Sequence, residues 1–478
     1  MSPGPFDARV KRSRCSACAS SHLKVCTYLH ARLCRQRATI QVDQAKVQTV
    51  SSFSTKRRSP WTPKRERLTS PLPMLPLSSN TSRHLYYFQV FVERNTFVAG
   101  SASYGTDVAI LLGTESGHFL VNAVMALGAL EASRLHGPTR KMDSVAALQA
   151  YSSSLASLRQ TMAHSPSPSR IHVLWATLFL GLFELMQNET GDGWLLHMTH
   201  GTANALQAAG PLACQSGLGR SFFLQARVFE TSRALLLNKP TFLSNPDFEI
   251  DATRLNGSSL NHLLNIIVQC SQLRVRTGQF IEANNPLTEL GDLQEDALGL
   301  AAEGFRLRLA LESWRAGRTE IQSCENVQTH DAASHKAVLS KIFFAAISIY
   351  LSGVFDYEIL HWRHWGILVS TITEDQVQEH VRTILALTAL ALERSNLSPL
   401  LFLFPLRIAG ARSCQPWQRE RVLQLLARVG ASFAVAGAFQ MELGKNRPPE
   451  IEGIARKGRT ERDPVFSTGC GRLWWFES

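Results

Sequence analysis

From about Arg83 onward the apolar residues recur at the spacing of an α-helix, and this pattern continues to residue 445. Leu120, Val124 and Leu127, for example, follow one another at intervals of four and three residues, which places them on one face of a helix. The alternating patterns and hairpin turn signals that are typical of β-strands are nearly absent. The sequence therefore predicts an all-α, multi-helix domain over residues 83–445.

Residues 173–183 form the best candidate for a long apolar segment in this region. Every side of a helix over this run would be apolar, so we expect a central helix with neighbours all round. Glu184 ends the run after about three turns, whereas a bilayer span needs roughly 18 apolar residues. We therefore expect no membrane partner. Pro416, which precedes Val422 and Leu425, suits the first turn of another helix.

The charge of the chain is concentrated at its N-terminal end. Residues 1–82 carry fifteen Lys and Arg against three Asp and Glu, a surplus of +12, and the full chain has the same net charge of +12. Residues 83–478 are therefore neutral, with 35 residues of each sign. A small cationic segment joined to a large neutral domain is typical of a protein that binds a polyanion and is regulated elsewhere.

Residues 41–82 are rich in Ser, Thr and Pro, and we predict that they form a disordered linker. Such a segment buries too little apolar surface to offset the chain entropy that is lost on ordering. The two basic clusters within it fit a nuclear import signal or an arm that contacts phosphates, and a merely solvated linker is the alternative. The clusters consist of Lys56, Arg57 and Arg58 and of Lys64, Arg65 and Arg67. Residues 446–478 are predicted to be a disordered tail.

Four of the nine cysteines lie within residues 1–40. Cys15 and Cys18 have the spacing with which one tight turn supplies two of the four ligands of a zinc ion, and Cys26 and Cys34 follow. The other five cysteines are scattered singly, as expected of reduced thiols in the cytosol or nucleus. Basic side chains near the pair would lower the thiol pKa values and contact DNA phosphates. These side chains are Lys11, Arg12, Arg14 and Lys24.

The segment Cys-Ser-Ala-Cys-Ala-Ser-Ser-His-Leu-Lys-Val-Cys at residues 15–26 resembles the first half of the fungal six-cysteine binuclear zinc cluster. Transcription factors of that family hold two zinc ions through shared thiolates. The Ala-Ser-Ser run is similar to that of regulators of secondary-metabolite gene clusters. The resemblance implies a DNA-binding head over residues 1–40, in which Lys24 falls near the base-reading position of the family.

The head departs from the family pattern in two ways. Seven residues separate Cys18 from Cys26 where the family has six, and after Cys34 the next cysteine is Cys214. The second pair and the sixth cysteine are therefore missing, and four thiolates cannot bridge two zinc ions in the manner of the family.

Three interpretations of this degenerate head stay open. It could be a rebuilt site for one zinc ion, a head that no longer binds metal, or a basic tail with unrelated free cysteines. The ligands of the rebuilt site would be Cys15, Cys18, Cys26 and Cys34, or a set that includes His22 or His30.

The helical region carries a second resemblance. Residues 119–133 resemble the early helix of the fungal-specific transcription factor domain, and further loose similarities continue through 147–159, 175–185, 194–211 and 229–246. Together they span residues 83–445. The resemblance implies an α-helical regulatory domain that follows a zinc cluster, senses signals or partners and carries the activation function.

Two pairs of histidines, three residues apart, could be taken for metal ligands: His197 with His200, and His361 with His364. No carboxylate or cysteine at helical spacing completes either set, so we expect structural roles. A nucleophile elbow, a Walker loop, a dinucleotide motif and an aspartate-rich magnesium motif are all missing from the sequence. We therefore expect a protein that is not an enzyme, with the aromatic residues in its core and a small-molecule pocket between helices as the alternative.

These patterns predict a nuclear, zinc-dependent, sequence-specific regulator of RNA polymerase II transcription, with a secondary-metabolite gene cluster as its expected target. Its expected partners are double-stranded DNA, a second copy in a homodimer, and the transcription machinery or co-regulators. The alternative is a helical protein-interaction or ligand-binding regulator whose head binds neither zinc nor DNA.

Overall fold

The computed structural model describes residues 79–97, 104–114, 117–136, 141–164, 170–190, 201–248, 259–284, 294–317 and 332–445. The chain divides into residues 1–70 and 71–478, and all described residues fall in the second unit. Within these ranges the fold is helical, and the β-structure is a single isolated bridge between Thr96 and Leu397. The prediction of an all-α, multi-helix domain is confirmed.

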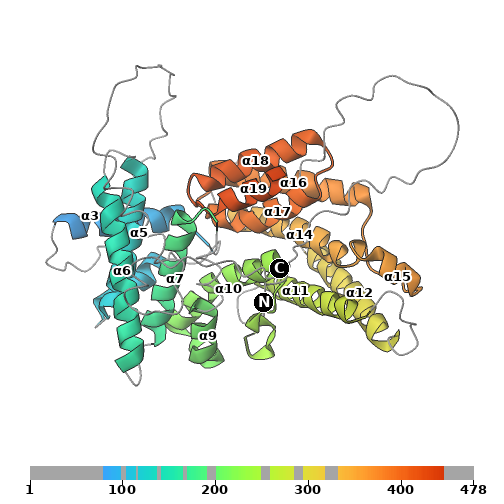
Figure 1. The fold of residues 1–478 in the computed structure, drawn as a ribbon, viewed down its shortest axis with the longest axis horizontal. Helices are drawn as coiled ribbons and strands as arrows, with labels where there is room; N and C mark the ends of the chain where they lie inside the picture. The colour runs from blue at the N-terminus through green and yellow to red at the C-terminus, as the bar shows by residue number, and fades with distance from the viewer. Residues whose placement is uncertain are drawn as a thin grey trace, which may run out of the picture. The chain divides into compact units, whose positions relative to one another are not determined.

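The α-helices follow one another along the whole described region (Figure 1). In the first part they are α3 (Ser79–Arg94), α4 (Tyr104–Gly113), α5 (His118–His136), α6 (Lys141–His164), α7 (Arg170–Gln187), α9 (Ala203–Ala209) and α10 (Gly217–Leu237). In the second part they are α11 (Ser259–Ala283), α12 (Gln294–Ala316), α14 (Ala332–Asp356), α15 (Ile359–His364), α16 (Glu374–Arg394), α17 (Leu403–Ala411), α18 (Pro416–Gly430) and α19 (Ala436–Lys445). Short 3-10 helices lie between them: η3 (Pro211–Cys214), η4 (Phe242–Ser244), η5 (Pro246–Phe248) and η9 (Pro399–Phe402).

Helix α3 begins at Ser79, four residues before the start that the periodicity suggested. The predicted head, linker and tail otherwise lie outside the described residues, and the division into these parts stays a prediction.

Helix α7 is buried on every side, as its apolar sequence predicts. All residues from His172 to Met186 are buried, and Trp175 is completely enclosed. Its neighbours include α5, α6, α9 and α10. Burial of a whole helix surface explains why residues 173–183 carry no polar face.

Helix α3 crosses α5 at a glycine. A Cβ atom on Gly128 would lie 1.9 Å from the carbonyl oxygen of His84, so only glycine allows the two backbones to approach this closely. The same stretch of α3 is joined to the start of α6, because Arg83 and His84 both contact the carboxylate of Asp143. Burial would raise the pKa of Asp143, but its hydrogen bonds to Arg83 and His84 outweigh burial and lower it.

Helix α14 is the central helix of the second part and packs against α11, α12, α16 and α17. By length and composition, residues 335–356 could cross a membrane, but 94% of the most apolar window is buried inside the protein. The sequence analysis missed α14 as a long apolar segment because polar residues interrupt the run, among them Ser340, Ser348 and Ser352. These serines are also buried, so α14 is a core helix.

Two helix starts follow standard capping chemistry. Pro416 occupies the first turn of α18, as predicted. Helix α16 begins with a capping box, in which Thr373 and Gln376 each accept a hydrogen bond from the backbone N–H of the other.

Replacement of Gly128 by alanine is expected to destabilise the protein by about 1–3 kcal/mol, because the backbones of α3 and α5 must separate. Chemical denaturation followed by circular dichroism measures this change. The matched control is Gly278→Ala in α11, where a Cβ atom meets nothing within 4 Å; alanine there should stabilise the helix by up to about 1 kcal/mol. Equal effects of the two substitutions would contradict the close crossing.

The stability of the protein should fall between pH 6.5 and about 4 because of His380 in α16. Burial against neighbours that include Phe344 lowers the pKa of His380 to about 4, below the value of about 6.5 in an unfolded chain. The unfolded state therefore binds a proton that the folded state does not, and the free energy of unfolding decreases as the pH falls through this window. Denaturation curves for His380→Gln should show a shallower decline, whereas His364→Gln, which changes an exposed side chain, should follow the wild type.

Candidate functional site

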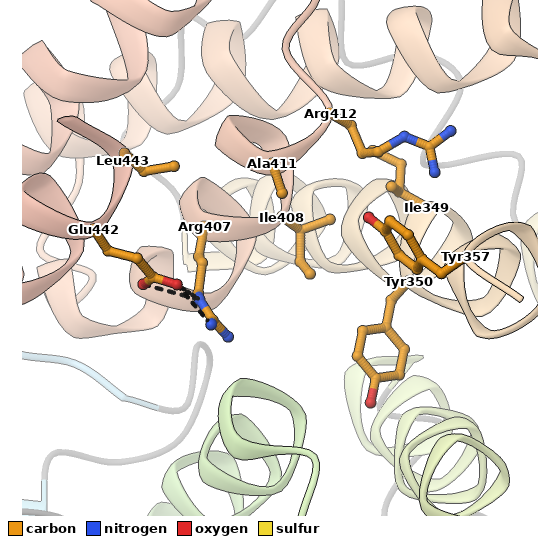
Figure 2. A pocket seen from close by; sticks show the side chains of 10 residues that line it. Ile349, Tyr350, Tyr357, Arg407, Ile408, Ala411, Arg412, Glu442 and Leu443 are labelled. Carbon is orange, nitrogen blue, oxygen red and sulfur yellow. Dashed lines mark hydrogen bonds and ion pairs between the residues drawn. The ribbon is translucent and has the colours of Figure 1, made fainter. Parts of the chain in front are cut away.

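A pocket opens between α14, α17 and α19 (Figure 2). The empty volume of about 440 Å³ includes space open to solvent, and the part that a water-sized group can enter is much smaller. Its walls combine aliphatic, phenolic and charged side chains from helices that are far apart in the sequence. The lining residues are Ile349, Tyr350, Gly353, Tyr357, Arg407, Ile408, Ala411, Arg412, Glu442 and Leu443.

Two glycines shape the walls of the pocket. A Cβ atom on Gly353 would lie 2.8 Å from the ring of Tyr357, so the phenol lies directly over the backbone of α14. A Cβ atom on Gly410 would lie 2.8 Å from Leu443, so this glycine lets α19 pack closely on α17. Larger side chains at either position would push against the pocket residues.

Arg407 and Glu442 form one end of the pocket (Figure 2). A guanidinium nitrogen of Arg407 lies 2.8 Å from a carboxylate oxygen of Glu442, and Arg407 also donates a 2.6 Å hydrogen bond to the carbonyl oxygen of Leu236. Only 10% of the Arg407 side chain is exposed. The ion pair therefore joins α17 to α19, while the hydrogen bond joins α17 to the end of α10.

Tyr350 makes the second connection to α10. Its hydroxyl donates a 3.0 Å hydrogen bond to the side-chain oxygen of Asn238, the residue that ends α10 in the left-handed conformation with φ of 49°. Asparagine is one of the few residues other than glycine that adopt this conformation readily. Burial raises the pKa of Tyr350, so the phenol stays protonated and remains a donor at neutral pH.

Arg412 and Tyr357 line the other end of the pocket. The Arg412 guanidinium lies 3.4 Å from carboxylate oxygens of Asp356 and Glu374, and 6.0 Å from the centre of the Tyr357 ring. Arg274 approaches the same ring to 5.8 Å. Burial raises the pKa of Asp356, although Arg412 opposes this shift. Both guanidinium groups are therefore close enough to the Tyr357 ring for cation–π attraction.

The two arginines of the pocket are already paired with carboxylates, so a strongly anionic ligand would have to compete with Glu442, Asp356 and Glu374. The remaining walls are aliphatic side chains and two phenol rings.

The residues predicted to bind zinc, DNA or import factors all lie outside the described residues. They are Cys15, Cys18, Cys26, Cys34, Lys11, Arg12, Arg14, Lys24, Lys56, Arg57, Arg58, Lys64, Arg65 and Arg67. Their roles therefore stay predictions. The described part of the chain contains no group of three or more His, Cys, Asp or Glu side chains arranged to hold a metal ion.

The histidine pairs have different outcomes. His197 and His200 lie outside the described residues. In α15, Nδ1 of His361 lies 3.2 Å from a carboxylate oxygen of Glu358, and its ring packs against Trp365, while His364 is exposed. The expectation that no carboxylate lies at helical spacing from this pair was therefore wrong, because Glu358 is three residues before His361.

The aromatic residues that the sequence analysis assigned to the core are buried where the structure describes them. Trp175 and Phe222 are completely enclosed, and Trp314 is 4% exposed and stacks on Phe344. Trp194 lies outside the described residues.

Sequence reasoning missed the pocket residues on α14, α17 and α19. One signal was available: residues 400–410 are apolar except for Arg407. A single charge within an apolar helix is expected to have a buried partner, but the sequence does not show that this partner is Glu442, 35 residues further along the chain.

Comparison with known protein families gives one result. The family model described as the fungal-specific transcription factor domain matches residues 83–441, which is most of the chain. No curated protein and no solved structure matches the chain.

Substitution of Arg407 by methionine is expected to destabilise the protein by about 2–4 kcal/mol, because Glu442 and the carbonyl group of Leu236 lose their partner. The matched control is Arg276→Met, which removes a more exposed arginine from its pair with Glu303 and should cost less than about 1 kcal/mol. Urea denaturation of both variants makes the comparison. If Arg407→Met lowers the free energy of unfolding no more than Arg276→Met does, the ion pair of Arg407 with Glu442 does not hold α17 and α19 together.

Proposed function

The chain belongs to the family of fungal-specific transcription factor domains, and from this premise we propose that it is a zinc-dependent, sequence-specific DNA-binding regulator of RNA polymerase II transcription. A role in transcription regulation is what membership of the family supports, and it agrees with the all-helical fold of the described residues. The observation that carries the proposal is the match of the helical domain to this family. In the sequence, this domain follows a basic segment that contains four cysteines.

In this proposal the N-terminal head holds a single zinc ion. Four thiolates suit one tetrahedral zinc ion, whereas the bridged pair of zinc ions would need six cysteines. Cys15, Cys18, Cys26 and Cys34 would be the ligands. Zinc would fold the short segment around itself, because a metal site of this kind contributes the folding free energy that a small core lacks.

The basic residues around the cysteines would contact DNA. Lys11, Arg12 and Arg14 precede the first cysteine, and Lys24 lies between the second and third. Contacts with phosphates would position the head, and Lys24 would approach base edges in the major groove. The linker clusters at residues 56–58 and 64–67 would serve nuclear import, and we propose the nucleus as the site of action. The helical domain would pair with a second copy and with co-regulators at a secondary-metabolite gene cluster.

The pocket at Tyr350 and Arg407 favours a second candidate function. A regulator that senses a small molecule needs a site between helices, so that binding of the molecule changes how those helices pack. The residues of this pocket connect α14, α17 and α19 to the end of α10. In this alternative the helical domain binds a ligand or a protein partner, and the head binds neither zinc nor DNA.

The Cys15→Ser, Cys18→Ser double variant is expected to lose its zinc and at least tenfold in DNA affinity. Zinc content of the full-length protein after dialysis is measured by atomic absorption, and affinity by electrophoretic shifts with a selected pool of DNA fragments. Counterion release by four basic contacts predicts a slope of about −3 to −4 for the logarithm of the binding constant against that of the salt concentration.

The control is Cys414→Ser, which changes an exposed cysteine of the helical domain and should retain both zinc and DNA binding. A full-length protein that carries no zinc and shifts no DNA at low salt would refute the first proposal and favour the ligand-binding alternative.

A further inference from the structure

Aromatic side chains of α4, α7 and α10 meet in the core of the first part of the fold. Tyr104 of α4 stacks on Trp175 of α7, with 6.2 Å between the ring centres, and Trp175 meets Phe222 of α10 edge to face at 5.6 Å. Tyr104 also stacks on Phe97 at 5.8 Å, and Phe97 meets Phe229 of α10 at 4.8 Å. We call these five residues the aromatic cluster; each is at most 6% exposed.

Two polar atoms of the aromatic cluster have no hydrogen-bond partner among the protein groups. They are the hydroxyl oxygen of Tyr104 and the indole nitrogen Nε1 of Trp175. Tyr104 is 3% exposed and Trp175 is completely buried, so bulk solvent reaches neither atom. A buried donor without a partner gives up the hydrogen bonds that it makes in the unfolded chain, and this costs free energy. Most buried polar groups therefore find a partner, either a protein group or an ordered water.

A third unpartnered atom lies on the side of α10 that faces the cluster. Gln225 follows Phe222 by three residues and precedes Phe229 by four, so the three side chains project from one face of the helix. Tyr104 is linked to Phe222 through Trp175 and to Phe229 through Phe97, which places its ring level with the intervening turn. That turn carries Gln225, which is 2% exposed and whose amide oxygen Oε1 has no hydrogen-bond partner among the protein groups.

The three unpartnered atoms complement one another chemically. The Tyr104 hydroxyl and the Trp175 N–H group are donors, whereas the Gln225 amide oxygen is an acceptor. Burial raises the pKa of Tyr104, so its hydroxyl keeps its proton at neutral pH. None of these three atoms is hydrogen-bonded to another of them. One small molecule that both accepts and donates hydrogen bonds could satisfy all three from a position between them.

We propose that an enclosed water molecule bridges these helices: it accepts hydrogen bonds from Tyr104 and Trp175 and donates one to Gln225. Buried waters in proteins typically make about three hydrogen bonds to such groups. Because the surrounding side chains are almost completely buried, the occupant must be small enough to be enclosed when the chain folds, and this favours water over a larger polar ligand.

The bridging water would give the core a direction that apolar contacts lack. Helix α7 is apolar on every side, and burial of apolar surface does not by itself fix the rotation of a helix about its axis. Hydrogen bonds through one water would hold Trp175 of α7 in register with α4 and α10, because each bond restricts the distance and angle between its groups. This inference is independent of the proposed function, and its failure would leave the proposals on zinc, DNA and ligand binding intact.

Replacement of Tyr104 by phenylalanine tests the bridge, because it removes one hydroxyl and keeps the ring. If the water is present, the variant loses a hydrogen bond to it, and the equilibrium constant for unfolding should rise about fivefold or more. If the hydroxyl is unpartnered, its removal should leave that constant unchanged or lower it. Urea denaturation of the full-length protein measures the constant. The matched control is Tyr86→Phe, at a residue that is 56% exposed, which should change the constant less than about twofold.

A crystal structure of the full-length protein, at a resolution that shows ordered waters, distinguishes the bridge from a direct contact between side chains. The proposal expects one water within about 3.2 Å of all three atoms, and it expects this water to be displaced or less ordered in Tyr104→Phe. A direct hydrogen bond between the Tyr104 hydroxyl and Gln225, or well-ordered side chains with no water between them, would overturn the proposal. So would a Tyr104→Phe variant that is as stable as the wild type.

Discussion

Complete burial of two apolar helices is the constraint on which the described fold depends. Helix α7 in the first part and α14 in the second are each enclosed by neighbouring helices. A helix without a polar face must be covered on all sides, so the surrounding helices have to present apolar faces at matching positions. Amphipathic helices such as α16 and α18 present an apolar face to the neighbouring helices and a polar face to water. The need to enclose two central helices thus decides which faces of the surrounding helices are apolar.

Some buried polar groups of this fold connect segments that lie far apart in the sequence. Arg407 joins α17 to α19 and to the last turn of α10, and Tyr350 joins α14 to the residue that ends α10. A buried group of this kind costs free energy unless it is paired, so each pairing restricts how the helices can be placed. The pocket lies where these connections meet. A ligand there would contact the groups that hold four helices in register, which makes the pocket a suitable place for occupancy to change the arrangement of the domain.

The parts of the fold that could be predicted from sequence are those in which a single local pattern decides the outcome. The central position of α7 follows from an apolar run without polar residues, and the start of α18 follows from Pro416. Helix α14 was missed because its buried serines break the apolar run, and a buried serine cannot be told from an exposed one without its neighbours. The partner of Arg407 lies 35 residues away on another helix, and no local pattern specifies such a pairing.

The separation of charge in the sequence gives the proposed DNA-binding head and the helical domain different responses to salt. The N-terminal segment holds the whole surplus of +12, whereas the helical domain is neutral. Binding of the head to DNA would gain its free energy from released counterions and would weaken steeply as the salt concentration rises. A contact made through the neutral helical domain would release few counterions, so salt would change its strength little. Comparison of binding at low and high salt therefore separates the role of the helical domain from that of the head.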